Sequence, residues 1–191
     1  MCGRYYIEIE DDEMRDMINR IAEETVGQTG GKAIKTSGEV FPADIVPVRT
    51  GVLQYRPMKW GFTGFNSRPV INARSETALE KPMFREPMRE HRCLIPACGY
   101  YEWQKTDGGR EKTKYRIFLP GDILFFAGCY RLEKGSLLPH FVILTRQAAG
   151  GAEAIHDRMP VILPEKHART WLHESPHVQT EAITALTYRI A

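Results

Sequence analysis

Four β-type segments between residues 92 and 147 constrain the fold of this chain more than any other feature. They are rich in β-branched and aromatic residues, which favour strands. Their sequences are RCLIPACGYYEWQK (92–105), KYRIFL (114–119), ILFFAGCYR (123–131) and HFVILTR (140–146). The segment TDGGR (106–110), between the first two, has the residues of a tight hairpin turn. This succession predicts a sheet with antiparallel neighbours.

Other segments predict further strands and a few helices around this sheet. RYYIEIE (4–10) alternates like a strand, and residues 51–62 predict one or two more. From Asp11, apolar residues recur at helical spacing, residues 76–91 predict a short helix broken at Pro82 and Pro87, and residues 164–173 predict a last helix. We therefore expect an α+β fold: a single domain over residues 1–191 with a curved mixed or antiparallel sheet, or a barrel-like core, and peripheral helices.

Composition narrows the class of protein without identifying it. The chain has 191 residues, of which 42% are hydrophobic, and this suits one domain with a substantial core. The formal net charge of +2 neither requires nor excludes a nucleic-acid partner, so any basic site must be local. The sequence lacks an apolar run of bilayer length, and its early residues are acidic where a signal peptide is apolar. We expect a cytoplasmic protein that does not bind membranes.

The four cysteines do not form a metal-binding or disulfide pattern. Cys93, Cys98 and Cys129 are expected to be small buried apolar residues. The spacing of His167, His173 and His177 is a weak metal signal, for which surface histidines are the simpler explanation. We expect neither a metal nor a cofactor.

Cys2 differs from the other cysteines because of its position. If Met1 is removed, Cys2 carries a thiol and an α-amine whose pKa is roughly 7.7–8.0. Such a 1,2-aminothiol attacks aldehydes: the amine forms an imine, and the sulfur closes a five-membered thiazolidine ring. A nearby cation such as Arg4 favours the thiolate. The alternative is that Cys2 is only an early residue of a strand.

Three other stretches carry groups that could work with Cys2. INARSET (71–77) contains Asn72, GYYEW (99–103) contains Glu102, and IHDRMPVIL (155–163) contains His156. Each has an ordinary alternative: Asn72 in a turn, Glu102 on the solvent face of a strand, and His156 as a helix cap. Together, one nucleophile, one carboxylate, one imidazole and one amide form a plausible active-site set.

Several sequence blocks, in order, resemble one family. The blocks are MCGR (1–4), MKWGF (58–62), INARSET (71–77), EKPMFR (80–85), RCLIPACGYYEW (92–103) and IHDRMPVIL (155–163). They cover most of the chain, and chance agreement of ordered blocks is far rarer than that of one short motif. On these blocks the chain resembles the SRAP family of abasic-site processing proteins.

The resemblance implies an activity on damaged DNA. Members of the family sense abasic sites in single-stranded DNA, and the residue matching Cys2 forms a thiazolidine with the sugar aldehyde after Met1 is removed. Autoproteolytic and lyase-type activities are also attributed to the family, in the DNA damage and SOS responses. By position, Glu102 matches the carboxylate beside the amine, His156 the residue that handles protons at the sugar, and Asn72 the orienting amide.

The resemblance also suggests DNA contacts. Arg4, Arg74 and Arg158 match candidates for binding phosphates, a role that suits the planar guanidinium. Trp60 and Trp103 are candidates to stack on bases, although both are equally compatible with a buried core. In relatives the loop after MKWGF often holds a tryptophan near the DNA. Here it is the short TGFNSRP (63–69), with Phe65 as its only aromatic residue, and we count Phe65 among the candidate DNA contacts. The expected partner is single-stranded DNA with an abasic site, bound by a monomer near replication forks in the nucleoid.

Two other functions use the same residues. Cys2 could attack an amide, as in a thiol peptidase or an N-terminal-nucleophile amidohydrolase, with Glu102 and His156 transferring protons. Alternatively, the motif residues could bind single-stranded DNA without a covalent step.

Overall fold

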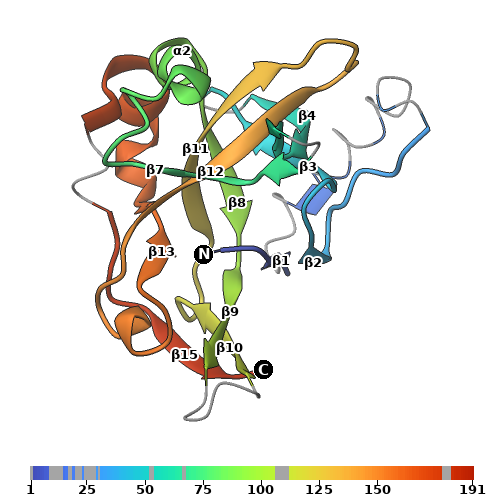
Figure 1. Ribbon diagram of the computed structural model, residues 1–191. Coiled ribbons are helices and arrows are strands. Elements are labelled where there is room, and N and C mark those ends of the chain that lie inside the picture. The colour runs from blue at the N-terminus through green and yellow to red at the C-terminus, as the bar shows by residue number, and fades with distance from the viewer. Residues whose placement is uncertain are drawn as a thin grey trace.

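The computed structural model describes residues 2–8, 15–16, 19, 23, 29, 31–51, 54–65, 68–105, 112–177 and 182–191 (Figure 1). Two expectations fall mainly outside this part of the chain. Of the helix expected from Asp11, only Arg15, Asp16, Asn19 and Glu23 are described, and these four are helical. The turn expected at 106–110 is not described, but the strands on either side pair antiparallel up to Lys105 and Lys112.

Five strands close into a barrel. They are β3 (Ile45–Arg49), β4 (Tyr55–Trp60), β8 (Arg92–Ala97), β11 (Leu124–Leu132) and β12 (Pro139–Gln147). Going around, β12 pairs with β4, β4 with β3, β3 with β8, β8 with β11, and β11 again with β12. The pairing of β12 with β4 is parallel and the other four are antiparallel. A closed sheet leaves its strands without open edges, and the expected barrel-like α+β fold is confirmed.

Short strands extend the barrel where two of the candidate segments lie. β7 (Asn72–Arg74) runs parallel to β12, and β13 (Arg158–Pro160) pairs antiparallel with β12. β14 (Ile162–Leu163) pairs with β11. A separate two-stranded hairpin joins β5 (Phe62–Thr63) to β6 (Pro69–Val70). The INARSET and IHDRMPVIL segments are therefore both attached to β12.

A second sheet packs beside the barrel and carries the start of the chain. Its strand order is β15-β10-β9-β1-β2, and every pairing is antiparallel. The bounds are β1 (Tyr5–Ile7), β2 (Gly38–Val40), β9 (Gly99–Lys105), β10 (Lys112–Phe118) and β15 (Thr187–Ile190). In Figure 1, β9, β10 and β15 lie at the end of the molecule opposite to the helix α2 (Pro82–Glu90).

Gly99 connects the barrel to this second sheet. The segment expected as one strand over 92–105 divides at Cys98 into β8 and β9. Gly99 has φ 154°, and a Cβ at this position would lie 2.4 Å from the Tyr6 hydroxyl and 2.5 Å from the carbonyl of Ile117. Only glycine fits both this backbone conformation and this close approach.

The helices differ from the expectation in two places. The segment 76–91 contains one unbroken helix, α2 (Pro82–Glu90), with Pro82 in its first turn and Pro87 inside it. Pro87 leaves the carbonyl of Met83 without its usual helical donor, and Arg131 Nη1 lies 3.4 Å from that oxygen as a substitute. Instead of one last α-helix, the chain forms a 3₁₀ turn (Glu165–His167) and a π-helical turn (Thr170–Glu174). Among the described residues, no helix has the length and hydropathy needed to cross a membrane.

Candidate active site around Cys2

Cys2 lies just upstream of β1, separated from it by Gly3 and Arg4, and is fully buried against the barrel. It belongs to the same buried cluster as core residues of β1, β4 and β8, among them Tyr5, Met58 and Ile95. Burial raises the pKa of the Cys2 thiol far above its usual range, and the carboxylate of Glu102 raises it further. In this state of the protein the sulfur is therefore a protonated thiol rather than a thiolate.

Asn72 fixes the backbone of Cys2. It begins β7, where it pairs with Ile143 of β12, and its Nδ2 donates a hydrogen bond to the carbonyl oxygen of Cys2 at 2.9 Å. Its Oδ1 is buried and accepts no hydrogen bond from the described residues. The amide thus orients the first residues of the chain and keeps one buried acceptor beside them.

Glu102 approaches Cys2 from β9. β9 pairs with β1, and the backbone N–H of Tyr101 donates to the carbonyl of Arg4 at 2.9 Å, which continues the pairing toward the N-terminus. Glu102 is 3% exposed, so its carboxylate acts on Cys2 with little screening by solvent. The alternative of a solvent-facing glutamate in an alternating strand is therefore wrong for this position.

His156 lies between the 3₁₀ turn Ala152–Ala154 and β13. Its Nδ1 is 3.0 Å from the backbone nitrogen of Arg158 and 2.7 Å from Oδ1 of Asp157. The N–H of Arg158 needs the lone pair of Nδ1, whereas a hydrogen bond to Asp157 needs a proton on it. A ring whose Nδ1 carries no proton suits the first contact, and a ring with a proton on Nδ1 suits the second.

A pocket of about 640 Å³ brings Glu102 and His156 to one opening. Its lining also includes Trp103, Gln104, Lys112, Ala154, Ile155 and Asp157. Gln104 joins the two sides of the pocket, because its Nε2, from β9, donates at 2.6 Å to the carbonyl of Ala154 in the 3₁₀ turn before His156. Glu102 therefore belongs both to this pocket and to the surroundings of Cys2, so it connects the buried Cys2 to the surface.

The expected DNA contacts divide into exposed and buried residues. Arg74 is exposed on β7, Phe65 is 90% exposed, and Arg4 and Trp103 are half-buried on the second sheet. Trp60 is fully buried: its Nε1 donates to the carbonyl of Ile71, and its ring stacks on a neighbouring core ring. Trp60 is thus a core residue and not a surface for bases, which corrects the expectation.

Arg158 also departs from its expected role. Its guanidinium makes two hydrogen bonds to Glu76, at 2.7 and 2.9 Å, and a third to the carbonyl of Thr145 at 2.7 Å. Only 10% of the side chain is exposed. Arg158 therefore holds β13, β12 and the INARSET segment together rather than gripping phosphate.

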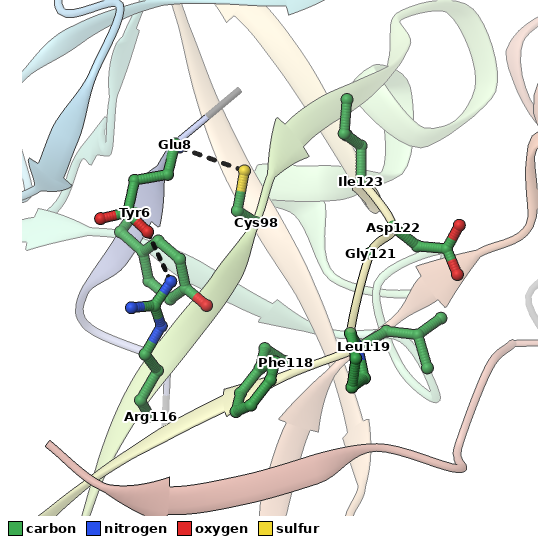
Figure 2. A pocket seen from close by; sticks show the side chains of 10 residues that line it. Tyr6, Glu8, Cys98, Arg116, Phe118, Leu119, Gly121, Asp122 and Ile123 are labelled. Atoms are coloured by element: carbon green, nitrogen blue, oxygen red, sulfur yellow. Dashed lines mark hydrogen bonds and ion pairs between the residues drawn. The ribbon is translucent and has the colours of Figure 1, made fainter. Parts of the chain in front are cut away.

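Cys98 lies apart from the two buried cysteines with which it was grouped. Cys93 and Cys129 are fully buried, as expected, but Cys98 is half-buried. It lines a second pocket, of about 620 Å³, together with Tyr6, Glu8 and Arg116 (Figure 2). The backbone N–H of Glu8 donates to its Sγ at 3.1 Å. Among the described residues, no group of three or more His, Cys, Asp or Glu side chains could hold a metal ion.

A family model described as SOS response associated peptidase (SRAP) matches residues 1–190. The chain belongs to this SRAP family. Its Cys2, Asn72, Glu102 and His156 all fall within the matched residues.

The SRAP chain is similar to several proteins named as abasic site processing proteins. It is 44% identical over 108 residues to YobE of Bacillus subtilis, covering 54% of this chain and 49% of that protein. It is 32% identical over 126 residues to YedK of Escherichia coli, covering 64% and 56%, and 30% identical over 155 residues to HMCES of Rattus norvegicus, covering 61% and 44%. The chain spans about half the length of the curated relatives it matches.

Solved structures share the SRAP fold at lower identity. A protein from Bacteroides thetaiotaomicron has a TM-score of 0.77 at 23% identity, covering 99% of this chain and 91% of that chain. A phage-related protein from Bordetella bronchiseptica has a TM-score of 0.74 at 24% identity, covering 100% and 94%. These likenesses support the barrel and the second sheet.

Proposed function

We propose that this chain processes abasic sites in single-stranded DNA by capturing them covalently with Cys2. The observation that carries the proposal is the setting of Cys2, which Asn72 holds by its carbonyl and the buried Glu102 influences electrostatically. The SRAP membership and the names of the relatives supply the substrate class. The role in a DNA damage or SOS response follows from the same source.

The proposed reaction begins with hydrolysis of the bond between Met1 and Cys2, which adds one water and exposes the α-amine. The abasic deoxyribose opens to an aldehyde at C1′. The amine adds to C1′ and loses one water to give an imine. The Cys2 sulfur then adds to the same carbon while its proton passes to nitrogen, and a thiazolidine results. No oxidant or reductant is needed.

The protonation of the thiol decides the order of these steps. Because burial and Glu102 keep the Cys2 sulfur protonated, the amine attacks first and the sulfur second. Glu102 takes the proton from the ammonium before that attack. Asn72 holds the carbonyl of Cys2, and its buried Oδ1 is suited to accept a hydrogen bond from the new amine. Cys2 is fully buried here, so loss of Met1 is the change that we propose makes it reachable.

We assign proton transfer at the sugar oxygen to His156, because it lines the same pocket as Glu102. Nδ1 of His156 accepts the backbone N–H of Arg158 when it carries no proton and donates to Asp157 when it carries one, so it has a partner in both states. The same pair would allow lyase-type cleavage by moving a proton at the sugar.

Binding of the strand is assigned to the exposed members of the predicted set. Arg4 and Arg74 bind phosphates, and Trp103 and Phe65 stack on bases. Only unpaired bases can stack in this way, and this favours single-stranded DNA. We propose that the chain acts as a monomer on DNA at replication forks, in the nucleoid.

The family description favours one second candidate, a peptidase acting on other chains. It would use Cys2 as nucleophile with Glu102 and His156, and it would cleave peptides in trans while ignoring abasic DNA. Removal of Met1 alone fits both functions.

A denaturing gel tests the proposal. Wild-type protein mixed with an abasic single-stranded oligonucleotide should give a band of higher mass that survives denaturation, and Cys2→Ala should give none. An equal band from Cys2→Ala would end the proposal. Cleavage of a peptide by wild-type protein without any DNA adduct would favour the peptidase.

A further inference from the structure

One face of the second sheet carries aromatic rings and cations in alternation. The registers place Lys114 opposite Trp103, Tyr101 beside Arg4, and Tyr6 opposite Glu39, so these side chains share a face. We call it the aromatic–cation face; its members are Arg4, Tyr6, Phe41, Tyr101, Trp103, Lys114 and Arg116. It adjoins the proposed active site, because Trp103 follows Glu102.

The rings hold the cations in place. The guanidinium of Arg4 lies 4.4 Å from the ring centre of Phe41 and 5.0 Å from that of Trp103. The ammonium of Lys114 lies 3.9 Å from the ring centre of Tyr101. Cation–π contacts of this kind position a cation without neutralising it. Both charges therefore remain available to an anion.

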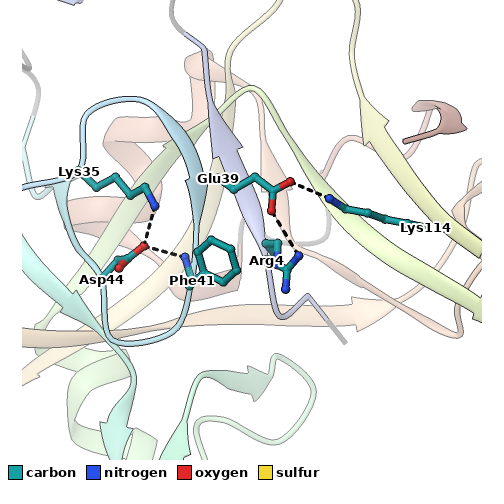
Figure 3. A network of polar contacts seen from close by, with 6 residues as sticks. All are labelled: Arg4, Lys35, Glu39, Phe41, Asp44 and Lys114. Atoms are coloured by element: carbon teal, nitrogen blue, oxygen red, sulfur yellow. Dashed lines mark hydrogen bonds and ion pairs between the residues drawn. The ribbon is translucent and has the colours of Figure 1, made fainter. Parts of the chain in front are cut away.

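Glu39 bridges these two cations (Figure 3). Its Oε2 is 3.3 Å from Nη1 of Arg4, and its Oε1 is 2.7 Å from Nζ of Lys114. About a third of each side chain is exposed: 30% for Arg4, 33% for Glu39 and 27% for Lys114. The hydrogen bond from Lys114 is the largest cause that lowers the pKa of Glu39, so its carboxylate stays ionised at neutral pH.

A carboxylate bridging two cations resembles one phosphodiester group. Both groups present two oxygens on one central atom with shared negative charge, and both accept hydrogen bonds from ammonium and guanidinium donors. The neighbouring acidic residue behaves differently. Asp44 pairs with Lys35 at 3.2 Å and also accepts the backbone N–H of Phe41 at 2.9 Å, so it is part of a turn. Within the described part of the chain, the Glu39 carboxylate is hydrogen-bonded to the side chains of Arg4 and Lys114 and not to the backbone, so it can leave without unfolding a turn.

We infer that Arg4 and Lys114 form one subsite for a backbone phosphate of single-stranded DNA, and that Glu39 occupies this subsite until the phosphate displaces it. The inference rests on the proposed function and extends it by two residues, Lys114 and Glu39. Glu39 acts as an internal competitor. It keeps the two cations ordered, and an anion that binds them more weakly than Glu39 does cannot displace it. The neighbouring rings are placed to stack on the bases of the same strand.

The test measures non-covalent binding separately from capture. Fluorescence anisotropy with an intact single-stranded oligonucleotide, which has no abasic site, gives the Kd at several salt concentrations. Glu39→Gln should tighten binding about two- to tenfold, because two exposed ion pairs no longer have to be given up. Lys114→Ala should weaken binding and lower the slope of log Kd against log salt by about 0.7, the value for one lost phosphate contact on a single strand.

Matched variants control for net charge. Glu174→Gln changes the charge by the same amount in the π-helical turn, where Glu174 lies 3.6 Å from Arg169, and it should leave the Kd within about twofold. Thermal unfolding of each variant checks that the fold is kept. If Glu39→Gln binds no better than wild type, or Lys114→Ala keeps the wild-type slope, the subsite is wrong.

Capture of an abasic oligonucleotide is scored on the same proteins at saturating DNA. Suppose that wild-type protein captures abasic DNA, but Glu39→Gln and Lys114→Ala bind intact DNA as tightly as wild type does. This result would overturn the subsite and leave the proposed function standing. Wild-type protein that neither binds nor captures would overturn the proposed function itself.

Discussion

The side-chain amide of Asn72 donates a hydrogen bond to the carbonyl of Cys2 at 2.9 Å, although the two residues are 70 positions apart. The bond joins the start of the chain to β7 and, through β7, to the barrel strand β12. The N-terminal end of the chain, with Cys2, is therefore positioned by the closed part of the fold.

Replacing Asn72 tests the importance of this bond. Asn72→Ala should slow thiazolidine formation roughly two- to tenfold, the range that corresponds to one lost hydrogen bond of about 0.5–1.5 kcal/mol. The rate is followed by intact mass against time, and urea unfolding checks that the variant is folded. A folded Asn72→Ala protein that reacts at the wild-type rate would mean that the bond does not position Cys2.

Replacing Arg158 by alanine should lower stability, whereas replacing Arg74 by alanine should weaken DNA binding. Arg158→Ala breaks the contacts to Glu76 and Thr145 and should lower the free energy of unfolding by about 2 kcal/mol, measured in urea. Arg74→Ala should barely change stability but should weaken DNA binding and flatten its salt dependence. The assignment of these roles fails if Arg74→Ala is the less stable of the two variants.

Stability should decline at alkaline pH because of buried thiols. Burial is the largest cause that raises the pKa of Cys2, Cys93 and Cys129. In the window above the unfolded value of about 9, the unfolded chain releases these protons while the folded chain retains them. The stabilisation is thus complete below pH 9 and is lost as pH rises, by up to about 1.4 kcal/mol per pH unit for each thiol.

Urea unfolding at pH 7 to 10 measures this decline, and Cys129→Val provides the comparison. Because the variant lacks one buried thiol, its stability should fall less steeply than that of wild type over the alkaline range. Identical slopes for the two proteins would show that Cys129 does not contribute.

Gly99 should not tolerate a side chain. In Gly99→Ala the Cβ would meet the Tyr6 hydroxyl and the carbonyl of Ile117, and the backbone would be strained, so we expect a loss of at least about 2 kcal/mol in unfolding free energy. Gly121→Ala is the control: Gly121 has φ 77°, but no atom of the described residues lies within 4 Å of its Cβ position, so only about 1 kcal/mol should be lost. Equal losses would show that the close contacts at Gly99 relax at no cost.

The sequence predicted the strands well but not which of them meet. Alternation and β-branched residues were enough to locate β9, β10, β11 and β12, because these signals are local. Closure of the barrel depends on the parallel pairing of His140 with Lys59 and of Phe141 with Trp60, which no local pattern encodes. The same long-range packing turned Pro87 from an expected break into a residue within α2.

In the candidate site, too, the sequence did not reveal which side chains are buried or meet. Trp60 and Trp103, like Arg74 and Arg158, have equivalent chemistry in the sequence, and only tertiary burial separates core from surface. Lys114 and Glu39 carried no motif and were missed. The alternation in RYYIEIE did indicate one face of a strand, but the registers of β1 with β2 and β9, and of β9 with β10, were needed to bring Glu39 and Lys114 to Arg4.

The central claim is that Cys2 acts through both its amine and its sulfur, and intact-mass spectrometry tests it most directly. Wild-type protein incubated with an abasic single-stranded oligonucleotide should appear without Met1, and its adduct should weigh the sum of that protein and the oligonucleotide minus one water. A variant with one residue inserted between Met1 and Cys2, which stays attached, keeps the thiol but lacks the amine, and it should give no such adduct. The same stable adduct from the insertion variant, or its absence from wild type lacking Met1, would contradict the account.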